Sequence, residues 1–252
     1  MIRVGTRQYF KGKHVDPSFK GFKPIVVLTK STEYGSLGPY VLRDEKGRIF
    51  ENVWQFSKLY KTVPAIKETY SRWDKRIIWD QQAQIHVNDE FITRDYLSWR
   101  EKGMNCRDAI RYPVGRSFRT RATCIGSLMN VEMKNDEIRL SDMKLFDYVE
   151  SRKVLYLPEY CRLVKKQKQY RDLQNLLKAK VNLLIIEVDG PRESSLSYYS
   201  EKYDVYNTFI QNNTMLVTTK NLKIMLNDTK HPFGHGYCLA ASLLGIDKEI
   251  LL

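Results

Sequence analysis

The sequence contains few of the residues that build metal centres or disulfide frameworks. Among 252 residues there are only 4 cysteines and 4 histidines, and no Cys-x-x-Cys pair occurs. His231 and His235 are four residues apart, but the Pro, Phe and Gly residues around them argue against a helical metal-binding face. Wide spacing of the cysteines favours free thiols in a reducing compartment. We therefore expect no metal and no cofactor. The cysteines are Cys106, Cys124, Cys161 and Cys238.

Long hydrophobic runs are also absent. The longest apolar stretch, from Val181 to Val188, is too short to cross a bilayer, and the first residues contain no hydrophobic export segment. These absences predict an intracellular protein, cytoplasmic or nuclear, without a membrane partner. A viral origin is compatible with the same features.

A strong positive charge is the most conspicuous feature of the composition. The chain contains 42 Lys and Arg against 29 Asp and Glu, a net charge of +13, together with 16 Tyr. Such an excess suggests a polyanionic partner, DNA or RNA, or a nucleotide-like phosphate ligand. The alternative is that the lysines only solvate the surface. With 42% hydrophobic and 28% charged residues, the chain is otherwise typical of a globular protein with one substantial core.

Part of this charge is concentrated in one segment punctuated by Pro113 and Gly115. With Tyr112 and Phe118 nearby, these arginines suit phosphate contact combined with ring stacking. A surface loop whose arginines pair with acidic residues elsewhere explains the pattern equally well. The arginines in question are Arg111, Arg116, Arg119 and Arg121.

Local patterns predict a mixture of helices and short strands. Alternating residues around an Asp-Glu-Lys-Gly turn predict a hairpin from Tyr40 to Phe50, which leads into a helix that begins at Glu51 and ends before Pro64. Strands are expected at Ile25–Thr29 and within 181–188. Helices are expected at Leu140–Val149, Tyr160–Leu177 and Leu222–Leu226.

The residues at the start of the first predicted helix form a chemically distinctive set. Trp54, Gln55 and Lys58 follow Glu51 by three, four and seven residues, which would place all four side chains on one helical face. A hydrophobic core stripe would contain Leu or Val instead. The pattern indicates a small polar and aromatic site.

Two further motifs lie in the second half of the chain. Glu187 falls near the end of the predicted buried strand, where a carboxylate must be either paired or functional. Phe233-Gly234-His235-Gly236 forms a glycine-punctuated loop that opens into a helix of small residues. Such a loop can present backbone N–H groups to a phosphate.

These motifs, in this order, resemble the NADAR family, whose members act on N-glycosidic bonds of ADP-ribosyl or ribosyl compounds. The resemblance rests on three separated blocks, and Phe233 and Ser242 depart from the usual Trp and Asn of the family. The segments at about 65–135 and 191–216 have no counterpart in a minimal member. The blocks are Pro39-Tyr40 with Glu51, Trp54, Gln55 and Lys58; Leu184 to Glu187; and Phe233 to Gly236 with Ser242 to Gly245.

The resemblance implies an α+β fold, mainly α-helical with a few short strands, in a single domain over residues 1–252. It also implies an N-glycosidase. Because of the net charge of +13, the expected reaction is removal of ADP-ribose from a modified nucleobase in DNA or RNA, with the extra segments gripping the strand. Two alternatives stay open: a nucleic-acid-binding protein without catalysis, and an N-glycosidase that acts on a free phosphoribosyl intermediate.

Roles for individual residues follow as hypotheses. Glu51 and Glu187 are expected to approach one another across a cleft. One would stabilise an oxocarbenium-like sugar or orient a water, the other would align the ribose hydroxyls, and His235 would be a proton donor. Each role has a plainer alternative: Lys58 as a helix salt bridge, Trp54 as core and His235 as a turn cap. The expected substrate-binding residues are Tyr40, Trp54, Gln55, Lys58, Asp189, Phe233, Gly234 and Gly236.

Overall fold

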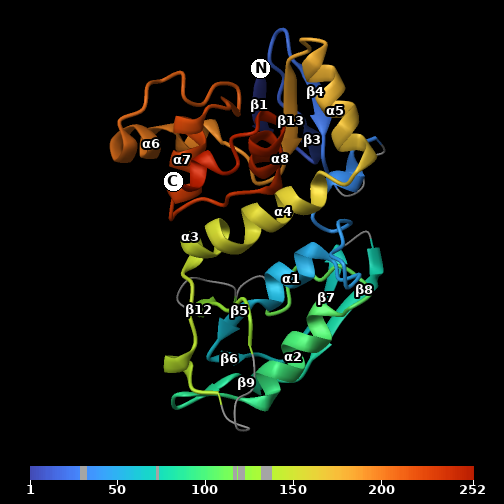
Figure 1. Ribbon diagram of the computed structural model, residues 1–252, viewed down its shortest axis with the longest axis vertical. Helices are drawn as coiled ribbons and strands as arrows, with labels where there is room; N and C mark the ends of the chain where they lie inside the picture. Colours follow the sequence, from blue (N-terminus) through green and yellow to red (C-terminus); the bar gives the residue numbers. More distant parts are fainter. Residues whose placement is uncertain (29–32, 72–73, 116–117, 119–122, 132–137) are drawn as a thin grey trace. The chain divides into compact units, whose positions relative to one another are not determined.

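The computed structural model describes residues 1–28, 33–71, 74–115, 118, 123–131 and 138–252. Its contacts divide the chain into two compact units. Unit 1 comprises Met1–Val41 together with Arg152–Leu252, and unit 2 comprises Leu42–Ser151. The polypeptide thus completes unit 2 between the two halves of unit 1 (Figure 1).

Unit 1 is built on a mixed four-stranded sheet in the order β14-β1-β13-β4. The strands are β1 (Ile2–Thr6), β4 (Lys23–Val26), β13 (Leu183–Glu187) and β14 (Thr214–Leu216). β1 runs parallel to β13 and antiparallel to β14, while β13 also pairs in parallel with β4. Every residue of β1 and β13 is buried, as expected for central strands covered on both faces.

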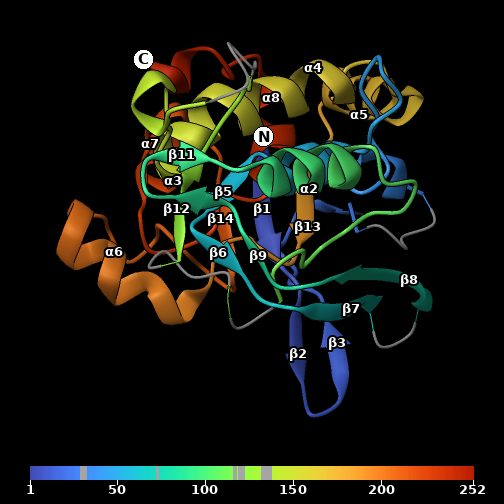
Figure 2. The ribbon, with the colours of Figure 1, turned by 90° about the horizontal axis from the view of Figure 1, so that it is seen from below.

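The most buried helix of unit 1 packs directly on this sheet. α8 (His235–Leu244) contacts β1 and β13 as well as the helices α4 and α5. Cys238, Leu239, Ala240 and Ala241 of this helix are completely buried. Figures 1 and 2 show α5 on the β4 side of the sheet and α7 on the β14 side. The other helices are α4 (Leu157–Val164), α5 (Lys168–Lys178), α6 (Leu196–Tyr203) and α7 (Thr219–Asn227).

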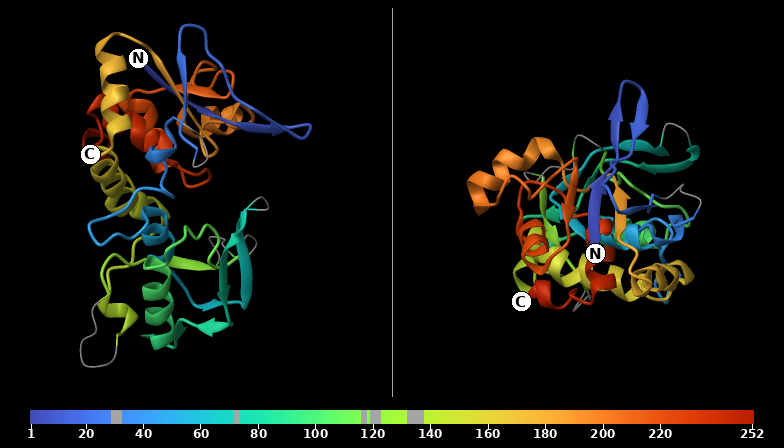
Figure 3. Two further views of the ribbon diagram at one scale, coloured as in Figure 1. Left: turned by 90° about the vertical axis from the view of Figure 1, so that its right-hand side faces the viewer. Right: turned by 90° about the horizontal axis from the view of Figure 1, so that it is seen from above.

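Smaller elements complete unit 1. A hairpin of β2 (Gln8–Phe10) and β3 (Lys13–Val15) projects from the sheet and is drawn in blue in Figure 3. A π-helical turn, Arg152–Tyr156, precedes α4. Short 3-10 helices occupy Gly35–Leu37, Glu193–Ser195 and Glu249–Leu251.

Unit 2 combines paired short strands with two helices around an aromatic core. Trp99 and Trp79 both pack against Phe56, with ring centroids 4.5 and 4.8 Å apart. α1 (Phe50–Phe56) contacts α2 (Arg94–Met104), and Gly103 permits this approach because a Cβ atom there would lie 2.0 Å from the Phe56 ring.

The strands of unit 2 form two-stranded ladders rather than one continuous sheet. The pairs are β5 (Lys58–Tyr60) with β12 (Cys124–Ser127), β6 (Thr62–Val63) with β9 (Gln84–Ile85), β7 (Ile66–Ser71) with β8 (Asp74–Gln81), and β10 (Val87–Asn88) with β11 (Phe91–Ile92). The short helices Leu140–Asp142 and α3 (Tyr148–Ser151) lie at its end. Among the helices of the described residues, none is long and apolar enough to cross a membrane.

The α+β class and several predicted elements are confirmed. β13, α1, α7 and α8 lie where the sequence predicts a strand or a helix. β4 covers the first part of the expected strand at 25–29, and residue 29 is outside the described residues. The four cysteines are free thiols. The elaboration expected at about 65–135 falls in unit 2 and the one at 191–216 in unit 1; that residues 1–252 act as a single domain stays a prediction.

Other element predictions are wrong in extent or kind. The hairpin from Tyr40 to Phe50 is reduced to one antiparallel bridge between Arg43 and Ile49, because the Asp44 side chain accepts the N–H groups of Lys46 and Arg48 and closes a tight turn. The helix expected at Leu140–Val149 is interrupted: a 3-10 helix covers Leu140–Asp142, residues 143–147 are not helical, and α3 begins only at Tyr148. There Phe146 exchanges backbone hydrogen bonds with Ser127 instead.

The single helix expected from Tyr160 to Leu177 is two helices. α4 ends in a tight turn, in which the N–H groups of Lys166 and Gln167 bond to carbonyls three residues earlier, and α5 starts again after an extended Gln167. Strand β1 was not expected at all. Its Arg3 is buried against the Phe19 ring, 3.7 Å from the ring centroid, and donates to Thr214.

Candidate functional site

In unit 2, Glu51 and its neighbours form a hydrogen-bonded chain. Glu51 lies in the first turn of α1 and is only 6% exposed. Gln55 Nε2 donates to Glu51 Oε1 at 2.7 Å, and Lys58 Nζ donates to Gln55 Oε1 at 2.8 Å. The amide of Gln55 therefore links the carboxylate to the ammonium group, and it fixes the orientation of the carboxylate.

Trp54 adds an aromatic wall to this chain. The indole is 7% exposed, and Lys58 Nζ lies 5.1 Å from its ring centroid, a cation–π distance. Lys58 belongs to β5 and not to α1, so the prediction of one helical face for all four residues is wrong. Its side chain nevertheless reaches back to Gln55 and Trp54, so the structure brings the four predicted residues together by a different route.

In unit 1, Glu187 is the last residue of strand β13 and is fully buried. Its side chain is 0% exposed. Gly236 N–H donates to Oε1 at 2.9 Å, and His235 Nδ1 lies 3.1 Å from Oε2. His235 Nε2 in turn lies 2.9 Å from the carbonyl oxygen of Val27. The expectation that a carboxylate at this position must be paired or functional is met by pairing.

These contacts determine the charge of His235. A carbonyl oxygen only accepts, so Nε2 must carry a proton, and Nδ1 faces a carboxylate, which favours a second proton. Burial opposes the charged imidazolium, but the charge and hydrogen bond of Glu187 outweigh it and raise the pKa of His235 above its usual value. Glu187 and His235 thus form a buried ion pair at the N-terminus of α8.

Gly234 and Gly236 leave the space that the Glu187 carboxylate of this ion pair occupies. A Cβ atom on Gly234 would lie 2.3 Å from Glu187 Oε2, and one on Gly236 would lie 2.7 Å from Oε1. The glycines allow close approach of the Glu187 carboxylate to the backbone, and substrate binding by Gly234 and Gly236 stays a prediction. The N–H of Gly236, which we expected to be available to a phosphate, is bonded to this carboxylate.

The remaining predicted residues lie apart from these two clusters or cannot be placed. Asp189 is exposed two residues beyond Glu187, and Phe233 stacks on Tyr237 with a centroid distance of 5.1 Å. The guanidinium carbon of Arg111 lies 5.1 Å from the Tyr112 ring centroid, and contact of Arg111 with a nucleic acid stays a prediction. Arg116, Arg119 and Arg121 lie outside the described residues.

Glu51 belongs to unit 2, whereas Glu187 and Tyr40 belong to unit 1. The approach of the two carboxylates across a cleft therefore stays a prediction, and so does a role for Tyr40 beside Glu51.

Sequence reasoning missed a second buried carboxylate in unit 1. Asp228 is 0% exposed and accepts hydrogen bonds from Tyr198 and Tyr199 at 2.5 and 3.0 Å and from His231 Nδ1 at 2.7 Å. Burial alone would raise the pKa of Asp228, but these donors hold it well below the usual range. The tyrosines of the 191–216 segment were the available signal, because phenols near an acid are typical donors to a buried carboxylate.

Asn52 was also missed, although it is next to Glu51. Its side chain is 0% exposed, donates to the carbonyl groups of Cys106 and Asp108, and accepts from the N–H of Ile110. It fastens the loop after α2 to the helix that carries Glu51. A buried amide within a helix is a sign of such a structural role.

Comparison with family models, with curated proteins and with solved structures finds no match to this chain. The functional argument therefore depends on the residues themselves.

Proposed function

We propose that the protein is an N-glycosidase of the NADAR type that hydrolyses an ADP-ribosyl or ribosyl N-glycosidic bond. The most specific form of the proposal is removal of ADP-ribose from a modified nucleobase in DNA or RNA. The observation that carries it is the Glu51–Gln55–Lys58 chain beside Trp54, since these are the residues on which the family resemblance rests. The net charge of +13 supports a polyanionic substrate.

The chemistry requires a fixed negative charge beside the sugar. As the bond between C1′ and the base nitrogen breaks, positive charge develops on the ribose, a water oxygen attacks C1′, and the departing base takes a proton. In this proposal the Glu51 carboxylate, oriented by Gln55, stabilises the cation or accepts the proton of the water. Trp54 provides a flat wall for a ring of the substrate, and Lys58 supplies positive charge for a phosphate.

The buried ion pair of unit 1 receives a different role in this proposal. With exposures of 0% and 7%, Glu187 and His235 are positioning residues that hold the N-terminus of α8 and strand β13 together. Their effect on the reaction is through the structure of unit 1.

The test is hydrolysis of ADP-ribosylated guanine and thymine oligonucleotides by wild type and by Glu51→Gln. Removing the negative charge should lower the rate of ADP-ribose release by about 100-fold or more, with little change in the melting temperature. Glu101→Gln is the matched control, because Glu101 is an exposed carboxylate on α2 in the same unit. Its rate should equal that of wild type.

Full activity in Glu51→Gln would refute the proposed role of Glu51. If wild type releases no ADP-ribose but binds an unmodified oligonucleotide in a salt-sensitive way, the protein is a nucleic-acid-binding protein and not an enzyme. Release only from a free phosphoribosyl compound would retain the glycosidase and change its substrate.

A further inference from the structure

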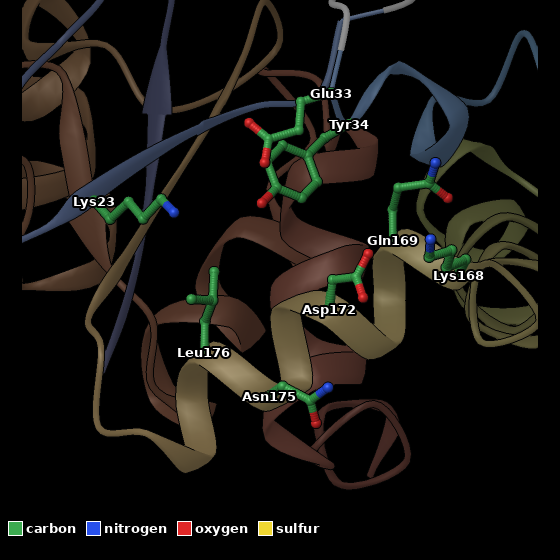
Figure 4. Close-up of a pocket in the computed structure, with 8 residues that line it drawn as sticks. All are labelled: Lys23, Glu33, Tyr34, Lys168, Gln169, Asp172, Asn175 and Leu176. Atoms are coloured by element: carbon green, nitrogen blue, oxygen red, sulfur yellow. The ribbon is translucent and has the colours of Figure 1, made fainter.

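Unit 1 contains a cavity that neither cluster above occupies. It opens between strand β4 and helix α5, has a volume of about 560 Å³ and is shown in Figure 4. This size is typical of small-molecule sites. Its lining is unusually polar and contains cations, carboxylates, amides and one aromatic ring: Lys23, Glu33, Tyr34, Lys168, Gln169, Asp172, Asn175 and Leu176.

One face of α5 supplies most of the wall. Lys168, Gln169, Asp172, Asn175 and Leu176 follow the spacing i, i+1, i+4, i+7 and i+8, which places them on neighbouring turns of the same face. The helix begins at Lys168 and contains no acidic residue in its first turn and no side-chain cap, so its N-terminal N–H groups add positive potential there.

Two other segments lie across the cavity from α5, and the cavity is open to solvent between them. Figure 4 shows Lys23 reaching in from β4 and the ring of Tyr34 facing the side chain of Asp172. Tyr34 is only 5% exposed, and burial together with the Glu33 carboxylate raises the pKa of its phenol to about 12. The ring therefore presents a neutral hydroxyl and an aromatic surface.

The cations of the cavity are available to a ligand. Within the described part of the chain, neither Lys23 nor Lys168 makes a side-chain hydrogen bond or salt bridge. Arg171 and Lys178 are exposed on the adjacent stripe of α5. Unit 1 as a whole contains 22 Lys and Arg against 12 Asp and Glu, whereas unit 2 contains 20 against 17. The positive charge of the protein is thus mainly in the unit that contains this cavity.

We propose that this cavity binds a nucleotide, with its phosphate on Lys23 and Lys168 and its ribose hydroxyls on Asp172. The amides of Gln169 and Asn175 then contact the edge of the base. The inference rests on the proposed function, because a nucleotide belongs to the class of substrate proposed there, and it concerns unit 1 by itself.

The mixture of charges decides in favour of this ligand class. A simple anion such as sulfate would be attracted by the two lysines but repelled by Asp172 and Glu33. A neutral sugar would make no use of the two exposed ammonium groups. A nucleotide carries both a phosphate and a vicinal diol, so it satisfies cations and carboxylates at once. Both a free nucleotide and one nucleotide of an RNA strand could supply this phosphate and ribose.

The test measures binding of AMP, adenosine and 2′,3′-dideoxy-AMP by titration calorimetry. Replacing both lysines, Lys23→Ala with Lys168→Ala, should weaken AMP binding about tenfold or more and leave adenosine nearly unchanged. Asp172→Asn should weaken the binding of AMP but not the binding of the dideoxy analogue, which lacks the ribose hydroxyls. Lys220→Ala on α7 is the control. It also removes an exposed lysine from unit 1, but α7 follows strand β14 at the opposite edge of the sheet.

Failure to bind AMP at millimolar concentration, or equal loss in the double variant and in Lys220→Ala, would overturn the assignment. A single-stranded RNA that binds at least tenfold more tightly than AMP would identify a strand as the source, and equal affinities would identify a free nucleotide. Glu51→Gln should bind AMP like wild type. Loss of hydrolysis with intact AMP binding therefore separates failure of the glycosidase proposal from failure of this one.

Discussion

Each unit of the protein buries one histidine, and the surroundings shift the pKa values of the two in opposite directions. In unit 1, His235 lies between the Glu187 carboxylate and the Val27 carbonyl oxygen. In unit 2, His86 is 0% exposed and packs against the rings of Tyr96 and Trp99, at centroid distances of 5.4 and 4.9 Å. Its Nε2 contacts Gln84 Oε1, and its Nδ1 has no hydrogen-bond partner among the described residues.

The difference shows how neighbouring groups, and not burial itself, determine the charge of an interior imidazole. Burial disfavours the cation in both units, and it lowers the pKa of His86 to about 4. Only His235 has a carboxylate that overcomes this penalty and raises its pKa. Unit 1 is therefore organised around a buried ion pair, and unit 2 around a neutral aromatic cluster.

Removing the Glu187 carboxylate should abolish the difference between the two buried histidines, and it should cause the largest loss of stability among these predictions. Glu187→Ala leaves a buried imidazole without its counter-charge and the Gly236 N–H without an acceptor. We expect a loss of about 3–5 kcal/mol in the free energy of unfolding, measured by hydrogen exchange of β13 amides against those of α2. A double change, Glu187→Gln with His235→Gln, should lose less. A loss below about 1 kcal/mol in Glu187→Ala would contradict the ion pair.

Acidification should act on the two units in opposite directions. The folded-state pKa of His86 is about 4, below the unfolded value of about 6.5, so the unfolded chain binds the proton first. Stability from His86 is complete above pH 6.5 and falls by about 3 kcal/mol as the pH drops from 6.5 to 4. The raised pKa of His235 has the reverse effect, because its contribution is complete below the unfolded value and is lost as the pH rises.

The measurement is hydrogen exchange of each unit between pH 4 and pH 8, corrected for the intrinsic exchange rate. His86→Gln should flatten the acid response of unit 2, whereas His14→Gln should not, because His14 is exposed on strand β3. An acid response of unit 2 that persists in His86→Gln would assign it to another group.

A substitution that crowds the Glu187 carboxylate should also lower the free energy of unfolding, but by less than its removal does. Gly234→Ala forces a methyl group toward Oε2 and should cost about 2 kcal/mol by overpacking. Gly12→Ala is the comparison: its Cβ would meet nothing within 4 Å, so only the left-handed φ of +81° opposes it, at about 1 kcal/mol. Urea unfolding of both variants gives the two values. Equal losses would show that close approach to the carboxylate is not what requires Gly234.

The predictions that succeeded depend on local patterns. The apolar run of β13 and the small residues of α8 specify their elements within a few residues of sequence, and a carboxylate inside such a run is conspicuous in any context. The Glu51 cluster was recognisable for the same reason, since Trp54 and Gln55 are close to it along the chain.

The parts that were missed depend on contacts between distant residues. Nothing near Glu187 indicates that Val27, His235 and Gly236 will surround it. Strand β1 contains Arg3 and Gly5, which hide its central position until Phe19 and Thr214 cover the guanidinium group. The break between α4 and α5 contains neither proline nor glycine. The cavity beside α5 likewise needs Lys23 and Asp172, which are far apart in sequence.

The order of the strands in unit 1 has a consequence for synthesis of the chain. β1 leaves the ribosome well before its parallel partner β13, which begins only at Leu183. All of unit 2, residues 42–151, emerges in between. The aromatic core of unit 2 can therefore form while β1 still lacks its neighbour, and the sheet of unit 1 closes only after β13 has emerged.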